Sequence, residues 1–255
     1  MVDFKIEELL ALQELAYWIE THLLYFIVLL YSLAAWSFFR SPDRAPHPLP
    51  YRRVPKSIVL AFILHLLLFA ARSFLSERPA FFTNFESLSF LALLIVFVAL
   101  VGCRRLGEAP IAGFFSSISA VALLLRALLC YSPLLTPLPL VYRNPWFQGH
   151  RSLLLIAYAL TFVALLIRFS LRWRPPVLDK VHIRGLVASG DILTDHQHRW
   201  IYLYRSAVPF LLLAIVLRFH WNGLALGHHF DWSQESLFSI LLLLLIVLHQ
   251  HCRAS

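Results

Sequence analysis

Long blocks of apolar residues follow one another along this chain, and their length constrains the fold more than any other feature. A helix needs about 20 mostly apolar residues to cross a bilayer, and the blocks are close to that size. Seven can be counted, over residues 21–39, 57–75, 88–103, 111–130, 152–171, 206–220 and 235–249. The third, sixth and seventh are short and need flanking residues to span. Because 60% of the 255 residues are hydrophobic and only 14% are charged, a soluble core could not hide these blocks, and we predict an integral membrane protein.

The same blocks predict an all-α fold, a polytopic membrane helix bundle with about seven transmembrane helices. No segment of membrane length alternates with a period of two, so strands are not expected. Residues 1–20 are expected to form an amphipathic lead-in and not a cleaved signal, since no basic region precedes the first apolar block. Its charged residues, which lie among Leu and Ile, are Lys5, Glu7, Glu8, Glu14 and Glu20. Residues 21–255 are expected to form a single transmembrane helical domain, because no internal repeat is evident and no polar stretch is long enough to fold alone.

Lysine and arginine are concentrated in alternate connections between the blocks. The connections after the first, third and fifth blocks are basic, with Arg40, Arg44, Arg52, Arg53, Lys56, Arg104, Arg105, Arg172, Arg174, Lys180, Arg184, Arg199 and Arg205. The intervening connections hold only Arg72, Arg78, Arg143 and Arg151. Basic loops stay in the cytoplasm, so the N-terminus is predicted outside and the C-terminus inside. The net charge of +8 then reflects topology and attraction to anionic lipid, and no nucleic-acid partner is expected.

Histidines are frequent, twelve in all, and some lie at membrane depth. On the predicted topology His22, His150, His220, His228 and His229 lie near the outer surface, His65 lies inside the second block, and His249 and His251 lie at the inner end of the last. Ionisable residues within a membrane are by default functional. Neutral imidazole is an axial ligand of haem iron, and an apolar bundle rich in Phe and Trp can shelter a porphyrin. The alternative for each single histidine is an interfacial residue that complements the helix dipole.

Three segments carry a family resemblance, in the order and on the sides of the membrane that the family requires. The segment ILHLLLFAARSFLSERPAFFTNFESLSFLALLIVF holds the first motif in Asn84, Phe85, Glu86, Ser87 and Phe90. The segment PLLTPLPLVYRNPWFQGHRSLLLIAYAL holds the second in Trp146, His150, Tyr158 and Ala159. The segment FDWSQESLFSILLLLLIVLHQHCR holds the third. When Asp231 is aligned with the aspartate of the motif, His249 falls on its histidine and no gap is needed. Over about residues 57–253 the chain resembles cytochrome c assembly proteins of the CcsA/ResC type, which include HemX-like proteins.

The resemblance implies a set of haem contacts. His249 would ligate haem iron inside the membrane and His150 would ligate it on the outer face. Asp231 would support the site or cap the last helix, and Asp231 and Glu235 are equally explained as carboxylates at a helix start. Trp146, His228 and His229 would lie beside the outer haem, while Arg72 and Arg151 would pair with its propionates.

The sequence departs from the family in its outer loop. Leu224, Ala225, His228 and Phe230 stand where the tryptophan-rich motif has Trp, Gly, Trp and Trp. We therefore expect most of that motif, and the family's final helix, to be absent. Either His220, His228 or His229 replaces the second outer histidine, or the chain has diverged from haem attachment.

The function that the resemblance implies is haem handling in cytochrome c maturation. The chain would present haem b at the outer face for thioether attachment to apocytochrome c, with a ResB-like membrane partner, and would then form part of a cytochrome c haem lyase. The membrane would be a bacterial inner (plasma) membrane or a thylakoid-type membrane. Two alternatives stay open, a haem-free CcsA-like scaffold in a larger membrane complex and a b-type haem electron carrier that uses His65 and His249.

Overall fold

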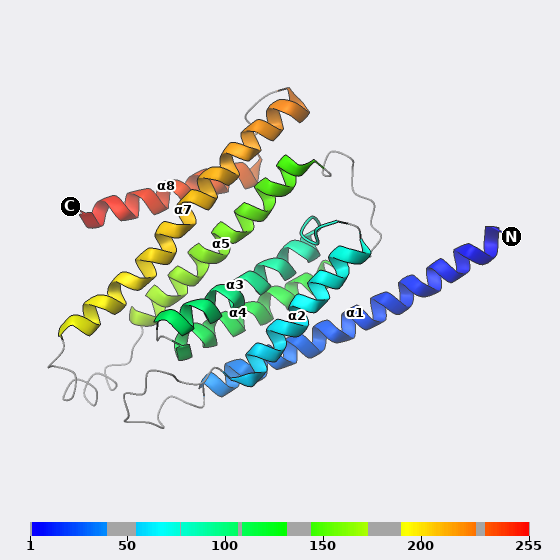
Figure 1. Cartoon of the computed structure of the whole chain (residues 1–255), viewed down its shortest axis with the longest axis horizontal. Coiled ribbons are helices and arrows are strands. Elements are labelled where there is room, and N and C mark those ends of the chain that lie inside the picture. The colour runs from blue at the N-terminus through cyan, green and yellow to red at the C-terminus, as the bar shows by residue number, and fades with distance from the viewer. Residues whose placement is uncertain are drawn as a thin grey trace. The chain divides into compact units, whose positions relative to one another are not determined.

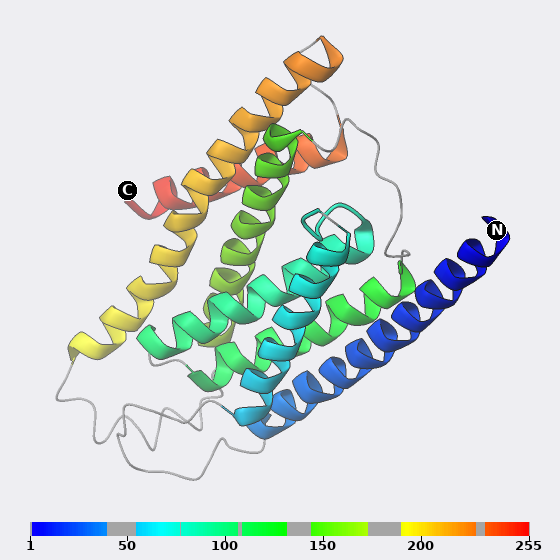
Figure 2. The same ribbon diagram turned by 45° about the vertical axis from the view of Figure 1, so that its right-hand side comes forward.

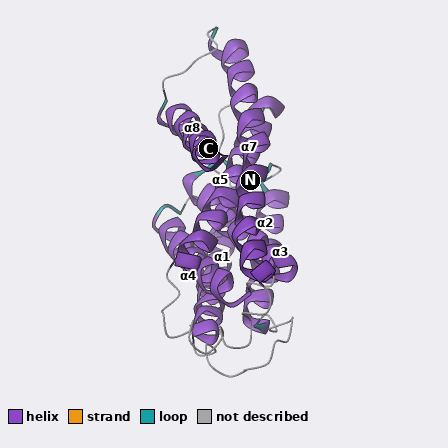
Figure 3. Ribbon diagram, turned by 90° about the vertical axis from the view of Figure 1, so that its left-hand side faces the viewer, coloured by secondary structure: helices purple, strands orange, loops and turns teal. Residues whose placement is uncertain are grey.

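The structure, a computed structural model, describes residues 2–39, 55–76, 78–106, 109–131, 144–172, 190–227 and 233–254. All regular structure within these ranges is helical, as the colouring of Figure 3 shows. The helices are α1 (Val2–Phe39), α2 (Lys56–Leu75), α3 (Asn84–Leu106), α4 (Ala109–Leu129), α5 (Pro145–Arg172), α7 (Gly190–Leu226) and α8 (Gln234–Ala254) (Figure 1). Each of the seven apolar blocks falls on one of them to within a residue. The predicted all-helical fold class is confirmed.

Within the described ranges, five helices are long and apolar enough to cross a membrane. The qualifying stretches are Glu14–Phe38, Lys56–Leu75, Asn84–Val101, Pro145–Arg168 and Ile201–Ala225. Two shorter apolar helical stretches are Gly113–Leu129 and Ser236–Leu248. Many large apolar side chains on the helices are exposed, including Leu67, Phe74 and Leu129, and such side chains suit contact with lipid tails. The chain therefore has the helices of an integral membrane protein.

The helices belong to two compact units, which are described separately. Unit 1 comprises Met1–Phe97 and Gly113–Tyr142, and so contains α1, α2 and most of α3 and α4. Unit 2 comprises Val98–Ala112 and Arg143–Ser255, and contains α5, α7 and α8.

Unit 1 is a four-helix assembly in which the first turns of α1 run on past the ends of α2 and α3 (Figures 1 and 2). Helix α2 packs on α1 and meets α3 through stacked rings, Phe69 with Phe90 at 4.7 Å between centroids. Helix α4 approaches α1 closely at Gly113, where an added Cβ would lie only 2.3 Å from the ring of Phe38. Glycine at this position therefore lets the Phe38 ring lie against the α4 backbone.

Unit 2 is built on α5 and α7, which lie side by side. Helix α5 begins with Pro145, whose fixed φ suits a first helical position, and Asn144 Oδ1 accepts a hydrogen bond from the Trp146 amide at 2.9 Å. Helix α8 contacts α7. It also meets α5 through the Tyr158 and Ser239 hydroxyls, 3.2 Å apart.

Candidate functional site

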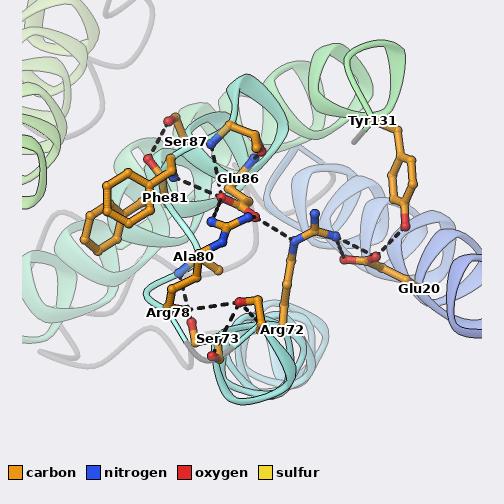
Figure 4. Close-up of polar contacts among 12 residues, drawn as sticks. Glu20, Arg72, Ser73, Arg78, Ala80, Phe81, Glu86, Ser87 and Tyr131 are labelled. Carbon is orange, nitrogen blue, oxygen red and sulfur yellow. Dashed lines mark hydrogen bonds and ion pairs between the residues drawn. The ribbon is translucent and has the colours of Figure 1, made fainter. Parts of the chain in front are cut away.

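Charged side chains are buried together at the end of unit 1 where α2 passes into α3. They form a group that we call the charge cluster, defined as Glu20, Arg72, Arg78, Glu86 and Tyr131 (Figure 4). Arg72 Nη1 donates to both carboxylate oxygens of Glu20 at 2.7 Å, and its Nε donates to Glu86 Oε1 at 3.1 Å. Arg78 donates two further bonds to the same Glu86 carboxylate, at 2.8 and 3.0 Å. The Tyr131 hydroxyl donates to Glu20 Oε2 at 2.7 Å. The cluster thus joins α1, α2 and α3 to Tyr131, which lies two residues beyond the end of α4.

Glu86 is held in place by the start of its own helix. The Glu86 amide donates to Thr83 Oγ1 at 3.2 Å, and the Thr83 amide donates back to Glu86 Oε2 at 3.1 Å. This reciprocal pair is a capping box, and it satisfies two amides that the first turn of α3 leaves without helical partners. The Phe82 amide also donates to Glu86 Oε2, at 2.9 Å. Glu86 therefore fixes the α2–α3 connection and the two arginines with one carboxylate.

The formal charges of the cluster sum to zero, with two arginines and two glutamates. Buried charges are tolerated when each is paired and hydrogen-bonded, and the side chains of Arg72 and Glu86 are only 4% and 0% exposed. The Arg72 guanidinium also lies 4.7 Å from the centre of the Phe85 ring, a favourable cation–π distance. Burial, and then the hydrogen bond to Glu20, raise the pKa of the Tyr131 hydroxyl, so this tyrosine stays neutral.

Arg72, predicted to pair with a haem propionate, has two carboxylate partners in this structure. A propionate would have to displace Glu20 or Glu86 to reach its guanidinium. Glu20, Arg78 and Tyr131 were not predicted as site residues. The Thr83-x-x-Glu86 spacing ahead of an apolar run is a sequence signal of a capping box, and it could have identified the hydrogen bonds of Glu86.

A second buried polar group of unit 1 surrounds His65, which is fully buried as its place inside an apolar block predicts. The Tyr31 hydroxyl of α1 lies 3.4 Å from His65 Nδ1, and the Ser89 hydroxyl of α3 lies 2.9 Å from Nε2. Both ring nitrogens thus face hydroxyl groups, which can donate or accept.

In unit 2, His150 is buried, at 3% exposure, near the start of α5. Its Nδ1 lies 2.8 Å from the backbone carbonyl oxygen of Ala214 in α7. A carbonyl only accepts, so Nδ1 carries the hydrogen and, in the neutral ring, Nε2 carries the lone pair. Metal-binding histidines are commonly oriented in this way by a carbonyl on the other nitrogen.

Aromatic side chains and a second histidine lie around this end of α5 and α7. Trp146 is partly exposed and meets the His220 ring edge to face, with centroids 4.8 Å apart. Phe147 lies against Trp221 at 5.8 Å and near His150 at 6.3 Å. The structure thus brings the predicted residue Trp146 into contact with His220, while His150 lies one helical turn further along α5 and bonds to α7.

Of the other predicted site residues, the structure describes some and leaves others outside its described part. Arg151 follows His150 and is half-buried, and Tyr158 of the second motif contacts Ser239. His249 lies on α8, but its side chain is outside the described part of the structure. Asp231, His228 and His229 fall in 228–232, which also lies outside it. Among the described residues, no group of three or more His, Cys, Asp or Glu side chains could hold a metal ion.

The chain was compared with known proteins in two ways. Neither a scan against protein-family models nor a search of curated proteins gave a match to this chain.

Proposed function

We propose that this membrane protein handles haem in cytochrome c maturation and holds it at the end of unit 2 where α5 begins. The observation that carries the proposal is that His150, oriented by the Ala214 carbonyl, lies one helical turn along α5 from Trp146, which contacts His220. An imidazole oriented by a backbone carbonyl beside aromatic rings has the donor chemistry and the apolar surroundings that haem requires. The resemblance of three sequence segments to CcsA/ResC-type proteins supports the same function.

His150 has the chemistry of an axial ligand. When Nδ1–H of the neutral ring donates to the Ala214 carbonyl, Nε2 carries the lone pair that can bind iron. Its burial adds a requirement: the ring must be uncovered where α5 begins before iron can reach it. His220 is exposed and touches Trp146, so it has geometric support among the three histidines proposed as the second outer ligand. Bound haem would supply the vinyl groups that apocytochrome c thiols attack. The protein would position haem, with His249 as a separate ligand at the far end of α8 and Asp231 and Arg151 as supporting side chains.

The proposed topology has seven membrane spans, the N-terminus outside and the C-terminus in the cytoplasm. The asymmetry of Lys and Arg between alternate connections supports it. The membrane would be a bacterial plasma membrane or a thylakoid-type membrane, and a ResB-like protein would be the partner. Reporter fusions after Lys56, Arg105 and Arg184 should then report the cytoplasm, and fusions after Arg78 and Arg143 the outside. An outside signal at Arg184 would exchange the sides of His150 and His249 and overturn the assignment.

The function is tested by haem content and cytochrome c maturation with the full chain and its partner. His150→Ala should abolish maturation while some haem stays bound, and His249→Ala should lower the haem content itself. Exogenous imidazole should partly restore maturation to His150→Ala, since it replaces a lost axial ligand but not a lost packing contact. His22→Ala is the control, because His22 is an exposed histidine of unit 1 bonded to the Trp18 carbonyl. Absence of a Soret band in the purified wild type, or normal maturation by both variants, would contradict the proposal.

A haem-free scaffold in a larger membrane complex is the second candidate, and one observation favours it. Arg72, the residue of unit 1 that was expected to contact haem, is already neutralised by Glu20 and Glu86. These contacts give Arg72 a structural role that needs no haem. The b-type electron carrier is not proposed, because both ring nitrogens of His65 face hydroxyl groups and iron would have to replace one of these contacts.

A further inference from the structure

A small cavity lies between the charge cluster and the hydroxyl that contacts His65. Its volume is about 10 Å³, near the lower limit of about 10–15 Å³ needed to hold one water molecule on this measure. The polar side chains that line it are Glu20, Arg72, Glu86 and Ser89. A buried water needs two to four polar partners, and these four side chains supply enough donors and acceptors.

Ser89 links this cavity to His65. Its hydroxyl lines the cavity and lies 2.9 Å from His65 Nε2. On the far side of the ring the Tyr31 hydroxyl faces Nδ1 at 3.4 Å. If Nδ1–H donates to Tyr31, then Nε2 accepts from Ser89, and the same contacts serve the other tautomer after both hydroxyls turn. The surroundings of His65 therefore accommodate a change in which nitrogen carries the proton.

The two glutamates that line the cavity are bonded to side chains that lie nearer the surface of unit 1. Glu20 and Glu86 line the cavity, and their carboxylates are bonded to Tyr131 and Arg78, the less buried members of the charge cluster. With one water in the cavity, polar groups would follow one another from these side chains to the ring of His65.

We propose that this cavity binds one water molecule and that the water completes a proton pathway by which His65 exchanges protons with the aqueous phase at the α2–α3 end. In the inward step a glutamate that has taken a proton from solvent gives it to the water, and the water gives a proton to Ser89 Oγ. The Ser89 O–H bond toward His65 breaks as the Nε2–H bond forms. The result is an imidazolium and regenerated water, serine and carboxylate, and the outward step reverses each transfer.

Burial makes the imidazolium costly, so His65 visits the charged form briefly and does not hold it. The groups facing the ring are Tyr31 from α1 and Ser89 from α3, and the charges next along the pathway are Arg72, Glu20 and Glu86, whose contacts involve α2, α1 and α3. This activity needs no haem and goes beyond the proposed function.

The experiment measures exchange of the His65 ring N–H with water by ¹⁵N NMR of the full chain in lipid nanodiscs. The signal is assigned as the one lost in His65→Gln, and cross-relaxation from bound water to the His65–Ser89 region is recorded in the same sample. In the wild type we expect water contact and ring exchange. Ser89→Ala should slow the exchange by about tenfold, the rate effect of one lost hydrogen bond in the transfer path.

Ala80→Val tests the water without removing any polar group. Ala80 is buried and lines the cavity, so the added methyl groups should displace the water, remove its cross-relaxation and also slow exchange by about tenfold. The matched control is Ser117→Ala, since Ser117 is a buried serine of unit 1 whose hydroxyl donates to the Gly113 carbonyl, away from the pathway. A His65 ring proton that does not exchange in the wild type overturns the proposal. So does wild-type exchange in both Ser89→Ala and Ala80→Val.

Discussion

Unit 1 buries charged side chains and unit 2 buries neutral polar ones, although both consist of apolar helices. Among the described side chains, the buried charged residues are Glu20, Arg72 and Glu86, and all lie in unit 1. The buried polar residues of unit 2 are uncharged or a histidine, among them His150, Asn222 and Ser239. Charges inside an apolar bundle are costly to separate, whereas a histidine or a serine hydroxyl can exchange partners at lower cost.

This difference separates two residues that the sequence places in the same role. Arg72 and His150 were both expected to contact haem, but Arg72 is fixed by opposite charges and His150 by one backbone carbonyl. A ligand that needs a residue to change partner meets a higher barrier at Arg72. The comparison therefore favours unit 2 as the place for a bound cofactor and leaves the charge cluster of unit 1 to roles that need no haem.

The largest effect should come from removing the Glu86 carboxylate. Glu86→Ala leaves Arg78 and part of Arg72 without an acceptor and removes the α3 cap, so unfolding free energy should fall by about 3–5 kcal/mol. Denaturation with SDS in mixed micelles, followed by circular dichroism, measures this. The exposed Glu14→Ala on α1 is the matched control and should stay within about 0.5 kcal/mol of wild type. A loss below about 1 kcal/mol for Glu86→Ala would show that unit 1 does not depend on its charges.

The next test asks whether Arg72 has any role beyond closing the charge cluster. Arg72→Met leaves the buried Glu20 carboxylate without its cation and should lower the free energy of unfolding by about 3–5 kcal/mol. The double variant Glu20→Met with Arg72→Met removes both charges and should recover most of that loss. If Arg72 only closes the cluster, the double variant binds haem as the wild type does. Loss of haem in a stable double variant would instead assign a propionate contact to Arg72 and remove the contrast between the units. Unfolding in mixed micelles and pyridine haemochrome content measure the two outcomes.

The sequence predicted the helices well because membrane spans are local features. Block length and hydropathy located the seven helices that the structure describes, and an apolar block around His65 predicted its burial. The extent of α1 was not predicted. We expected a lead-in over residues 1–20 and a separate span from residue 21, but one continuous helix runs from Val2 to Phe39.

The polar contacts could not be predicted from the sequence because they join residues far apart in the chain. Arg72 and Glu20 are 52 residues apart, Tyr131 and Glu20 are 111 apart, and His150 bonds a carbonyl 64 residues away. Hydropathy does not tell which buried arginine meets which glutamate. The capping box of Thr83 and Glu86 is the exception, since both residues lie within one turn and match a local pattern.

A smaller effect is expected from removing the hydroxyl of Tyr131, which donates to a carboxylate. Tyr131→Phe should cost about 1.5–3 kcal/mol, the range for a hydrogen bond to a charged group. Burial first, and then the bond to Glu20, raise the pKa of this hydroxyl above its ordinary value of 10.0. The neutral form thus stabilises unit 1 below about pH 10, and that contribution is lost as the pH rises through the raised pKa. Stability measured from pH 9 upward should fall less steeply in Tyr131→Phe than in wild type, and equal slopes would show that Tyr131 is already freely solvated.

The smallest effect should come from the matching tyrosine of unit 2. The Tyr158 hydroxyl meets another hydroxyl, Ser239 Oγ, at 3.2 Å between α5 and α8, so no charge is lost or stranded when it is removed. Tyr158→Phe should therefore cost about 0.5–1.5 kcal/mol, the range for a neutral hydrogen bond, and this cost should depend on the presence of Ser239. In a double-mutant cycle with Ser239→Ala the second substitution should add little, because the first has already broken the contact. Since Tyr131 and Tyr158 each lose one hydroxyl, the ratio of their costs compares the two units directly. If Tyr158→Phe costs as much as Tyr131→Phe, the pairing of charges does not explain how the polar groups of unit 1 differ from those of unit 2.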